Sequence, residues 1–220
     1  MNYLCIVSFP RSGSAALKNI INQKNEISLY NESNGLILNL CDFVIKIESL
    51  TSPLLYTKTG ELKNIGMRNF NKLNIDNIYQ SAKNIFIDDF LCANNKIVGW
   101  KENDISPIKF GEEKCYRYID TLKKIFPNIK FIFNTRNPIS TSSSGLWKRK
   151  SNAIDEINRW NTFLLNSYQK NLDNSIFVEH DIWSNDFNYL INKLESINID
   201  INTDECIKAF NFKLNHFKNW

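Results

Sequence analysis

The stretch SFPRSGS, residues 8–14, follows a short apolar run and carries an arginine in the middle of what should be a turn. The guanidinium of Arg11 is planar and permanently charged, which suits phosphate or sulfate oxygens. Ser12, Gly13 and Ser14 would expose backbone N–H groups at the positive end of the following helix. The pattern therefore predicts an anion-binding turn. An ordinary turn with Ser12 or Ser14 as the helix cap is the alternative.

A second arginine occupies a similar place in KFIFNTRNPISTSSSGLW, residues 130–147. Arg136 follows an apolar run, and residues 140–144 behind it are all serine or threonine. Ligands of open α/β sheets bind at the carboxyl ends of the strands. Two anion sites about 125 residues apart match a ligand that carries phosphate at both ends. Taken alone, the segment would equally suit a turn with a polar helix start.

Together, the two stretches resemble sulfotransferases that use 3′-phosphoadenosine-5′-phosphosulfate (PAPS). In that family a loop of the form P-[KR]-[ST]-G-[ST]-[ST] contacts the 5′-phosphosulfate. The resemblance implies this role for the residues at the matching positions, which are Arg11, Ser12, Gly13, Ser14 and Ala15. Ala15 departs from the usual hydroxyl residue, which puts one phosphate contact in doubt. The second family signature is Arg-x-Pro with a serine eight residues after the arginine, and it implies that Arg136 and Ser144 hold the 3′-phosphate.

The same resemblance implies where the chemistry would occur. Glu32, in ISLYNESN after the second expected strand, is the expected base for the acceptor proton. Arg11 would stabilise charge on the leaving phosphate. Lys101, in VGWKEND, would steady the sulfuryl oxygens or pair with Glu32, and Glu102 or Asp104 is the rival base. A solvated glutamate and a strand-end ion pair are the structural alternatives.

Other features match the family less closely. FVEHDIW, residues 177–183, resembles a strand ending of the family, but His180 fits imperfectly and is interpreted as a packed or surface histidine. WKRK, residues 147–150, is a basic cluster that would attract the nucleotide or an anionic acceptor, unless it forms a solvated face. Lys218 or Trp220 would lie near the nucleotide, with a solvated tail as the alternative.

Alternating strands and helices are expected to position these residues. Apolar runs rich in β-formers, without clean alternation, predict parallel strands buried on both faces. These strands are expected at 3–7, 26–30, 96–100, 130–134 and 175–178. Helical periodicity predicts helices at 119–126, 154–168 and 187–194. The sequence thus predicts an α/β fold of three layers, in which a central mostly parallel sheet is flanked by helices and carries a P-loop-like phosphosulfate-binding loop.

The length suits one compact domain, so residues 1–220 are expected to form a single sulfotransferase-like domain. Residues 41–95 fit the alternation least well. We expect a hairpin or irregular excursion around residues 59–60, followed by a helix through Ile78 and Phe86. This range is interpreted as an insertion that forms an acceptor-binding lid, with a structural flap as the alternative.

Composition limits the other classes of function. The net charge is +4, from 27 basic and 23 acidic residues, which is too small to indicate a nucleic-acid or membrane surface. The five cysteines include no CxxC pair, so no metal site is expected. No apolar run approaches the ~20 residues of a membrane span, and no signal-peptide pattern opens the chain. We therefore expect a cytoplasmic protein.

The sequence predicts a PAPS-dependent sulfotransferase. PAPS would be the co-substrate, and no metal would be needed. The sulfuryl group would pass to a hydroxyl of a carbohydrate or small metabolite by in-line displacement, with a carboxylate as base. A nucleotide kinase or NTPase is one alternative, disfavoured because the GxxxxGK[ST] loop is missing. A catalytically degenerate nucleotide-binding protein is the other.

Overall fold

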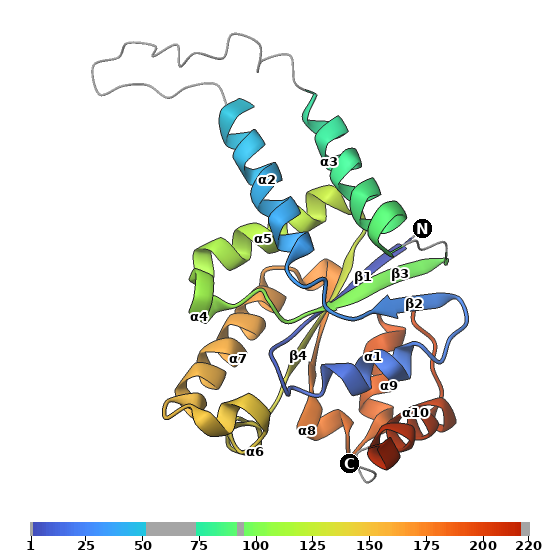
Figure 1. Cartoon of the computed structure of the whole chain (residues 1–220). Helices are drawn as coiled ribbons and strands as arrows, with labels where there is room; N and C mark the ends of the chain where they lie inside the picture. Colours follow the sequence, from blue (N-terminus) through green and yellow to red (C-terminus); the bar gives the residue numbers. More distant parts are fainter. Residues whose placement is uncertain (1, 52–73, 92–94, 217–220) are drawn as a thin grey trace.

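Five parallel strands form one central sheet in the computed structural model (Figure 1). The structure describes residues 2–51, 74–91 and 95–216. The strands lie in the order β2-β3-β1-β4-β5. Their bounds are β1 Asn2–Val7, β2 Ile27–Tyr30, β3 Ile97–Glu102, β4 Lys130–Thr135 and β5 Ser175–Glu179. The α/β fold with a central parallel sheet is confirmed, as are all five expected strands.

The central strands are buried on both faces, which explains why their sequences lack clean alternation. Successive residues of β1 enter opposite layers of the core. Cys5 and Val7 pack into one apolar cluster, and Leu4 and Ile6 pack into the other. Because all strands run in the same direction, their carboxyl ends meet at one edge of the sheet. The segments that carry the expected site residues leave the strands at this edge.

Helices cover both faces of the sheet, as the three-layer prediction requires (Figure 1). One face is covered by α2 Leu36–Thr51, α3 Ile75–Asn84, α5 Glu112–Ile125 and α7 Ala153–Gln169. The other face is covered by α1 Ser14–Ile21, α9 Phe187–Glu195 and α10 Thr203–His216. Short elements complete the fold: α4 Pro107–Phe110, α6 Pro138–Ser142, η3 Gly145–Arg149, η4 Leu172–Asn174 and α8 His180–Trp183.

The three helices expected from periodicity are all present. The expected helix at 119–126 is the second half of α5, which ends at Ile125, two residues before Pro127. The stripes at 154–168 and 187–194 lie within α7 and α9. In each case the apolar face packs against the sheet, so tertiary burial agrees with the local pattern.

Within residues 41–95, the described part is helical. The helix expected through Ile78 and Phe86 is present as α3, which continues directly into the π-helix η2 Ile85–Leu91. Cys41 and Phe86 are fully buried in the same core cluster as the sheet, so these helices belong to the fold. The turn expected at residues 59–60 lies outside the described residues. None of the described helices is long and apolar enough to cross a membrane.

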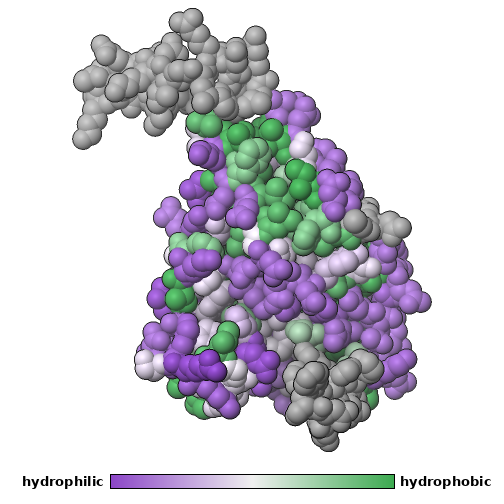
Figure 2. Space-filling view, viewed as in Figure 1, coloured by the Kyte–Doolittle hydropathy of each residue, from purple (hydrophilic) through white to green (hydrophobic). Residues whose placement is uncertain are grey.

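Apolar side chains also gather on the outer surface over α2 and α3 (Figure 2). Phe43 and Leu50 on α2, and Ile85 and Phe90 on η2, are each close to half exposed. The edge that carries the carboxyl ends of the strands is a different region of the molecule, and it holds the residues discussed below.

Candidate active site

The turn between β1 and α1 has an unusual backbone. Arg11 and Gly13 both adopt left-handed conformations, with φ of 71° and 87°. A Cβ atom at Gly13 would lie 1.9 Å from Cδ2 of His180, so glycine is required here by conformation and by space. Gly13 is the residue before α1, and the first N–H groups of that helix have no partner within the helix. The turn therefore presents backbone donors and a positive dipole end at the edge of the sheet.

The two arginine motifs, far apart in sequence, lie side by side in the structure. Nη1 of Arg136 donates to the carbonyl oxygen of Arg11 at 2.9 Å, and Nε of Arg11 donates to Oγ of Ser144 at 3.0 Å. The indole N–H of Trp147 donates to the carbonyl oxygen of Pro10 at 2.7 Å. Because β1 and β4 are neighbours in the sheet, the turns that follow them are brought into direct contact.

A buried amide supports the first turn from behind. Nδ2 of Asn134, near the end of β4, donates to the carbonyl oxygen of Ser12 at 2.9 Å. Its Oδ1 accepts a hydrogen bond from the indole N–H of Trp183 at 3.0 Å. Sequence reasoning missed both residues, although a polar Asn134 inside the run FIFNT was an available signal. Ser12 itself is fully buried, and its Oγ has no hydrogen-bond partner in the structure.

Most of the expected site residues line one cavity of about 460 Å³ at the carboxyl edge of the sheet. Those residues are Arg11, Gly13, Ser14, Ala15, Glu32, Lys101 and Arg136. Asn103 and His180 complete this part of the wall. Ser12 and Ser144 are not among the lining residues. The structure thus brings together both arginines, the start of α1 and the Glu32–Lys101 pair. We call this the arginine cavity.

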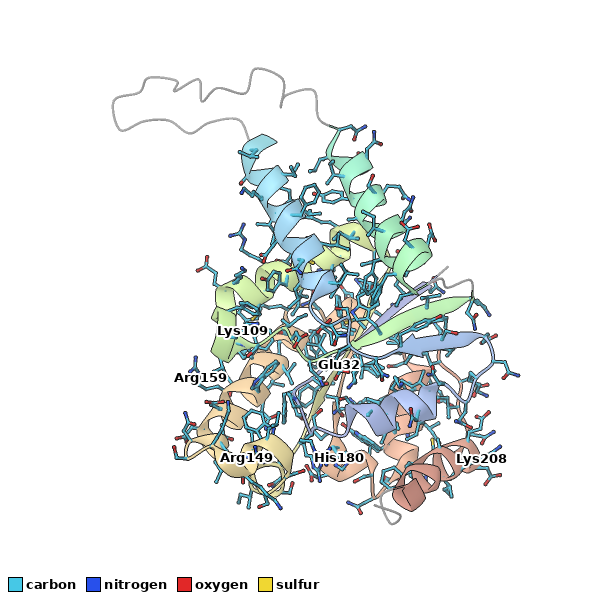
Figure 3. All side chains as sticks on the ribbon, in the orientation of Figure 1. Glu32, Lys109, Arg149, Arg159, His180 and Lys208 are labelled. Carbon is cyan, nitrogen blue, oxygen red and sulfur yellow. The ribbon has the colours of Figure 1, made fainter. Side chains whose placement is uncertain are left out.

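Glu32 and Lys101 form an ion pair inside the arginine cavity. Lys101 is nearly buried, while Glu32 is about one-third exposed at its side chain. Asn103 also donates from Nδ2 to Oε1 of Glu32 at 2.7 Å, a contact that sequence reasoning missed. Figure 3 shows Glu32 near the middle of the molecule, where the strand ends converge.

The environment of Glu32 keeps it ionised. Partial burial acts to raise its pKa, but the hydrogen bond from Lys101 and the charges of Lys101 and Lys18 outweigh burial, so the pKa is lowered. Lys18 has a lowered pKa in turn, because of burial and the nearby charge of Lys101. At neutral pH Glu32 is therefore a carboxylate that can accept a proton.

The rival base Glu102 is placed differently. Successive residues of a strand point to opposite faces, so Glu102 lies away from the cavity that Lys101 lines. It is fully buried, and it accepts hydrogen bonds from Oγ of Ser33 at 3.1 Å and from the backbone N–H of Asp104 at 2.9 Å. Asp104 lines a separate cavity. Neither rival carboxylate lines the arginine cavity.

Glu102 gives a pH-dependent prediction. Burial, with the nearby charge of Asp104, raises the pKa of Glu102 from 4.5 to about 7. Between pH 4.5 and about pH 7, the folded protein holds a proton on Glu102 that the unfolded chain releases. The contribution of Glu102 to the free energy of unfolding is therefore present at low pH and is lost as the pH rises through about 7. The Glu102→Gln variant keeps a neutral amide that can bond Ser33 and the Asp104 N–H. Relative to this variant, we expect the wild type to lose roughly 3 kcal/mol of unfolding free energy from pH 4 to pH 8.

Urea denaturation of both proteins across this pH range measures that difference. Other titrating groups are shared by the two proteins, so their contributions cancel to first order. A difference between the proteins that stays constant from pH 4 to pH 8 would contradict the assignment of a buried, proton-holding carboxyl at Glu102.

The remaining features of the sequence are placed as follows. His180 packs its ring edge-on against Trp183, with ring centres 4.8 Å apart, and also lines the arginine cavity.

Of the basic cluster 147–150, Trp147 is buried and Lys150 forms an ion pair with Glu156 at 2.5 Å. Lys218 and Trp220 lie outside the described residues. No group of three or more His, Cys, Asp or Glu side chains that could hold a metal occurs in the described part of the chain.

The fold and the site together define an α/β protein with a P-loop-like turn that opens the first helix and lines the same cavity as a carboxylate–lysine pair. A family model described as "Sulfotransferase family" matches residues 4–182. The chain therefore belongs to the sulfotransferase family, as the two motifs predicted. No curated protein sequence matches the chain.

One solved structure of low sequence identity shares the fold. The sulfotransferase domain from the Synechococcus PCC 7002 olefin synthase superposes with a TM-score of 0.59 at 15% identity, covering 96% of this chain and 77% of that one. Mouse sulfotransferase SULT7A1 complexed with PAP gives a TM-score of 0.49 at 16% identity, covering 96% of this chain and 64% of that one. At 15% identity the likeness to the olefin synthase domain concerns the fold alone.

Proposed function

We propose that this protein transfers a sulfuryl group from PAPS to an acceptor hydroxyl. The observation that carries the proposal is the composition of the arginine cavity. Two arginines, the start of α1 and the Glu32–Lys101 pair all line this cavity. Anion binding and proton acceptance are therefore possible in a single space at the edge of the sheet. The chemistry proposed requires no metal.

The residues of the arginine cavity fit a nucleotide with several anionic groups. The turn donates through backbone N–H groups, so Ala15 removes a side-chain hydroxyl but no main-chain donor. Nε of Arg136 is buried and has no hydrogen-bond partner in the structure, which leaves it available to an anion. Arg11 and Ser144 are bonded to each other. For them to hold the two ends of one nucleotide, as proposed, this hydrogen bond must open.

When bound, PAPS supplies the sulfuryl group: its sulfur–oxygen bond to the phosphate breaks as the bond to the acceptor oxygen forms, and adenosine 3′,5′-bisphosphate leaves. Glu32 is proposed to accept the proton that the acceptor hydroxyl loses. Arg11 and the N–H groups of the turn stabilise the charge on the departing phosphate. Lys101 holds Glu32 ionised before the reaction. If the ammonium of Lys101 moved from Glu32 toward the sulfuryl oxygens, the pKa of Glu32 would rise and Glu32 would become a stronger base.

We also propose that residues 1–220 act as one sulfotransferase-like domain, in which 41–95 is an insertion. The described residues of this range line neither the arginine cavity nor the cavity discussed below. The acceptor is proposed to be a hydroxyl compound, a carbohydrate or a small metabolite, and no nucleic-acid partner is proposed.

Ligand binding tests the proposal before any acceptor is known. Adenosine 3′,5′-bisphosphate at about a hundred times its Kd should stabilise the protein by ~2.7 kcal/mol, which raises Tm by roughly 5–10 °C without Mg²⁺. A thermal-shift series with this nucleotide and with ATP plus Mg²⁺ makes the comparison. A larger shift with ATP and Mg²⁺ would favour a nucleotide kinase. A shift with the bisphosphate, but no sulfuryl transfer from PAPS to any acceptor, would favour a degenerate nucleotide-binding protein.

A further inference from the structure

A second cavity of about 300 Å³ lies beside the arginine cavity, between α4, η3 and α7. Most of its exposed wall surface is apolar, and the apolar lining residues are Pro10, Ile108, Leu146, Trp147 and Trp160. This is within the size range of small-molecule sites, at the lower end. We call it the tryptophan cavity. The sulfotransferase motifs did not predict it, because its wall comes from three separate segments of the chain.

The tryptophan cavity adjoins the arginine cavity. Pro10 and Asn103 line both spaces. The amide of Asn103 is fixed at both ends: Oδ1 accepts from Oγ of Ser8 at 2.5 Å, and Nδ2 donates to Oε1 of Glu32 at 2.7 Å. A molecule in the tryptophan cavity could therefore direct a hydroxyl along Asn103 toward the Glu32 carboxylate.

The two tryptophans are held in place by contacts within the fold. The indole N–H of Trp147 is bonded to the Pro10 carbonyl, and the ring meets Phe9 edge-on at 6.4 Å between centres. Trp160 packs against the same Phe9 at 6.0 Å. Both tryptophans are at least 95% buried. A wall that needs no rearrangement loses little entropy when a rigid ring binds against it.

The charges around the tryptophan cavity cancel. Two lysines and two acidic residues take part in its lining: Lys109, Lys150, Asp104 and Glu156. Lys150 is occupied by its ion pair with Glu156 and also lies 5.0 Å from the centre of the Trp147 ring. Figure 3 shows Lys109 on α4, and its ammonium lies 4.8 Å from the centre of the Phe110 ring. This wall offers no excess of positive charge to a polyanionic acceptor.

We propose that the tryptophan cavity binds the acceptor and selects a neutral hydroxyl compound built on a flat apolar ring, such as a phenol. The proposal rests on the sulfuryl-transfer function proposed above. Of the two acceptor classes named there, it excludes carbohydrates and keeps small metabolites with an apolar ring. An apolar ring gains by leaving water for this wall. A sugar ring would bury several hydroxyls against a mainly apolar wall and leave some without partners.

The test uses the full chain with 2-naphthol as the apolar ring and N-acetylglucosamine as the sugar. In calorimetry with adenosine 3′,5′-bisphosphate present, 2-naphthol should bind at least tenfold more tightly than the sugar, and with PAPS it should be the better sulfuryl acceptor. The reverse order, with normal bisphosphate binding, would overturn the acceptor class and leave the sulfotransferase proposal standing. Failure to bind the bisphosphate would instead overturn the proposed function.

A matched pair of variants tests the location. Leu146 lines the tryptophan cavity, Ile139 lines neither cavity, and each side chain is 69% exposed. Because both are so exposed, neither aspartate substitution should prevent folding. Leu146→Asp should weaken 2-naphthol binding about tenfold and leave bisphosphate binding unchanged, whereas Ile139→Asp should change neither by more than twofold. Equal losses of 2-naphthol binding in the two variants would overturn the assignment of this cavity.

Discussion

The Glu32→Gln variant should lose roughly 10²–10⁴-fold in kcat, with little change in the Kd of adenosine 3′,5′-bisphosphate. Glutamine keeps the size of the side chain and an oxygen that can accept from Lys101 and Asn103. It cannot take a proton from the acceptor hydroxyl. The loss should therefore appear in turnover, while the arginine turns that are proposed to hold the nucleotide stay as they are. Steady-state kinetics with PAPS, together with calorimetry of the bisphosphate, separate the two effects.

Glu26→Gln is the matched control for this experiment. Glu26 precedes the other end of β2, and its side chain is 57% exposed in a loose ion pair with Lys96. It lines neither described cavity, so its kcat should stay within twofold of the wild type. If Glu32→Gln keeps kcat within threefold while binding the donor normally, Glu32 is not the base. Because Lys101 is only 6% exposed, thermal denaturation of the variant should check that losing its charged partner has not unfolded the site.

The second large effect is expected from Arg136→Ala. Hydrogen bonds to charged groups contribute ~1.5–3 kcal/mol, so removing the guanidinium should weaken adenosine 3′,5′-bisphosphate binding by roughly 10- to 150-fold. Binding of 5′-AMP, which lacks the 3′-phosphate, should fall by less than about threefold. Calorimetry with both nucleotides measures the two losses of affinity. Their ratio tests whether Arg136 binds the 3′-phosphate.

Arg136 has a structural contact that must be separated from its proposed role in binding. Arg136 also donates to the carbonyl of Arg11, so its removal could loosen the first turn and weaken both nucleotides. Equal losses for the bisphosphate and for 5′-AMP would therefore contradict a specific 3′-phosphate role. Arg149→Ala removes an arginine from η3 that lines neither described cavity, and it should change neither affinity by more than twofold.

Local sequence patterns were sufficient to predict the framework of this protein. Apolar runs placed all five strands, because a parallel strand buried on both faces needs a continuous apolar segment. The arginine turns could be found because glycine, serine and arginine have backbone and charge properties that few other residues supply. Parallel strands then implied that both turns would share one edge, which the structure confirms.

Contacts between distant segments could not be predicted in this way. The bond from Asn134 to the Ser12 carbonyl spans 122 positions, and that from Asn103 to Glu32 spans 71. Whether Lys101 or Glu102 faces the arginine cavity depends on which side of β3 each residue occupies. The tryptophan cavity exists only where α4, η3 and α7 meet.

The sequence by itself therefore determined the layered parallel fold, the family and the position of both arginine turns along the chain. Only the tertiary structure decided that Glu32 is paired with Lys101 in the arginine cavity, that Ser12 does not line it, and that a second cavity adjoins it. The physical reason is that propensity and periodicity act over a few residues. Hydrogen bonds, ion pairs and cavity walls depend on side chains that only folding brings together.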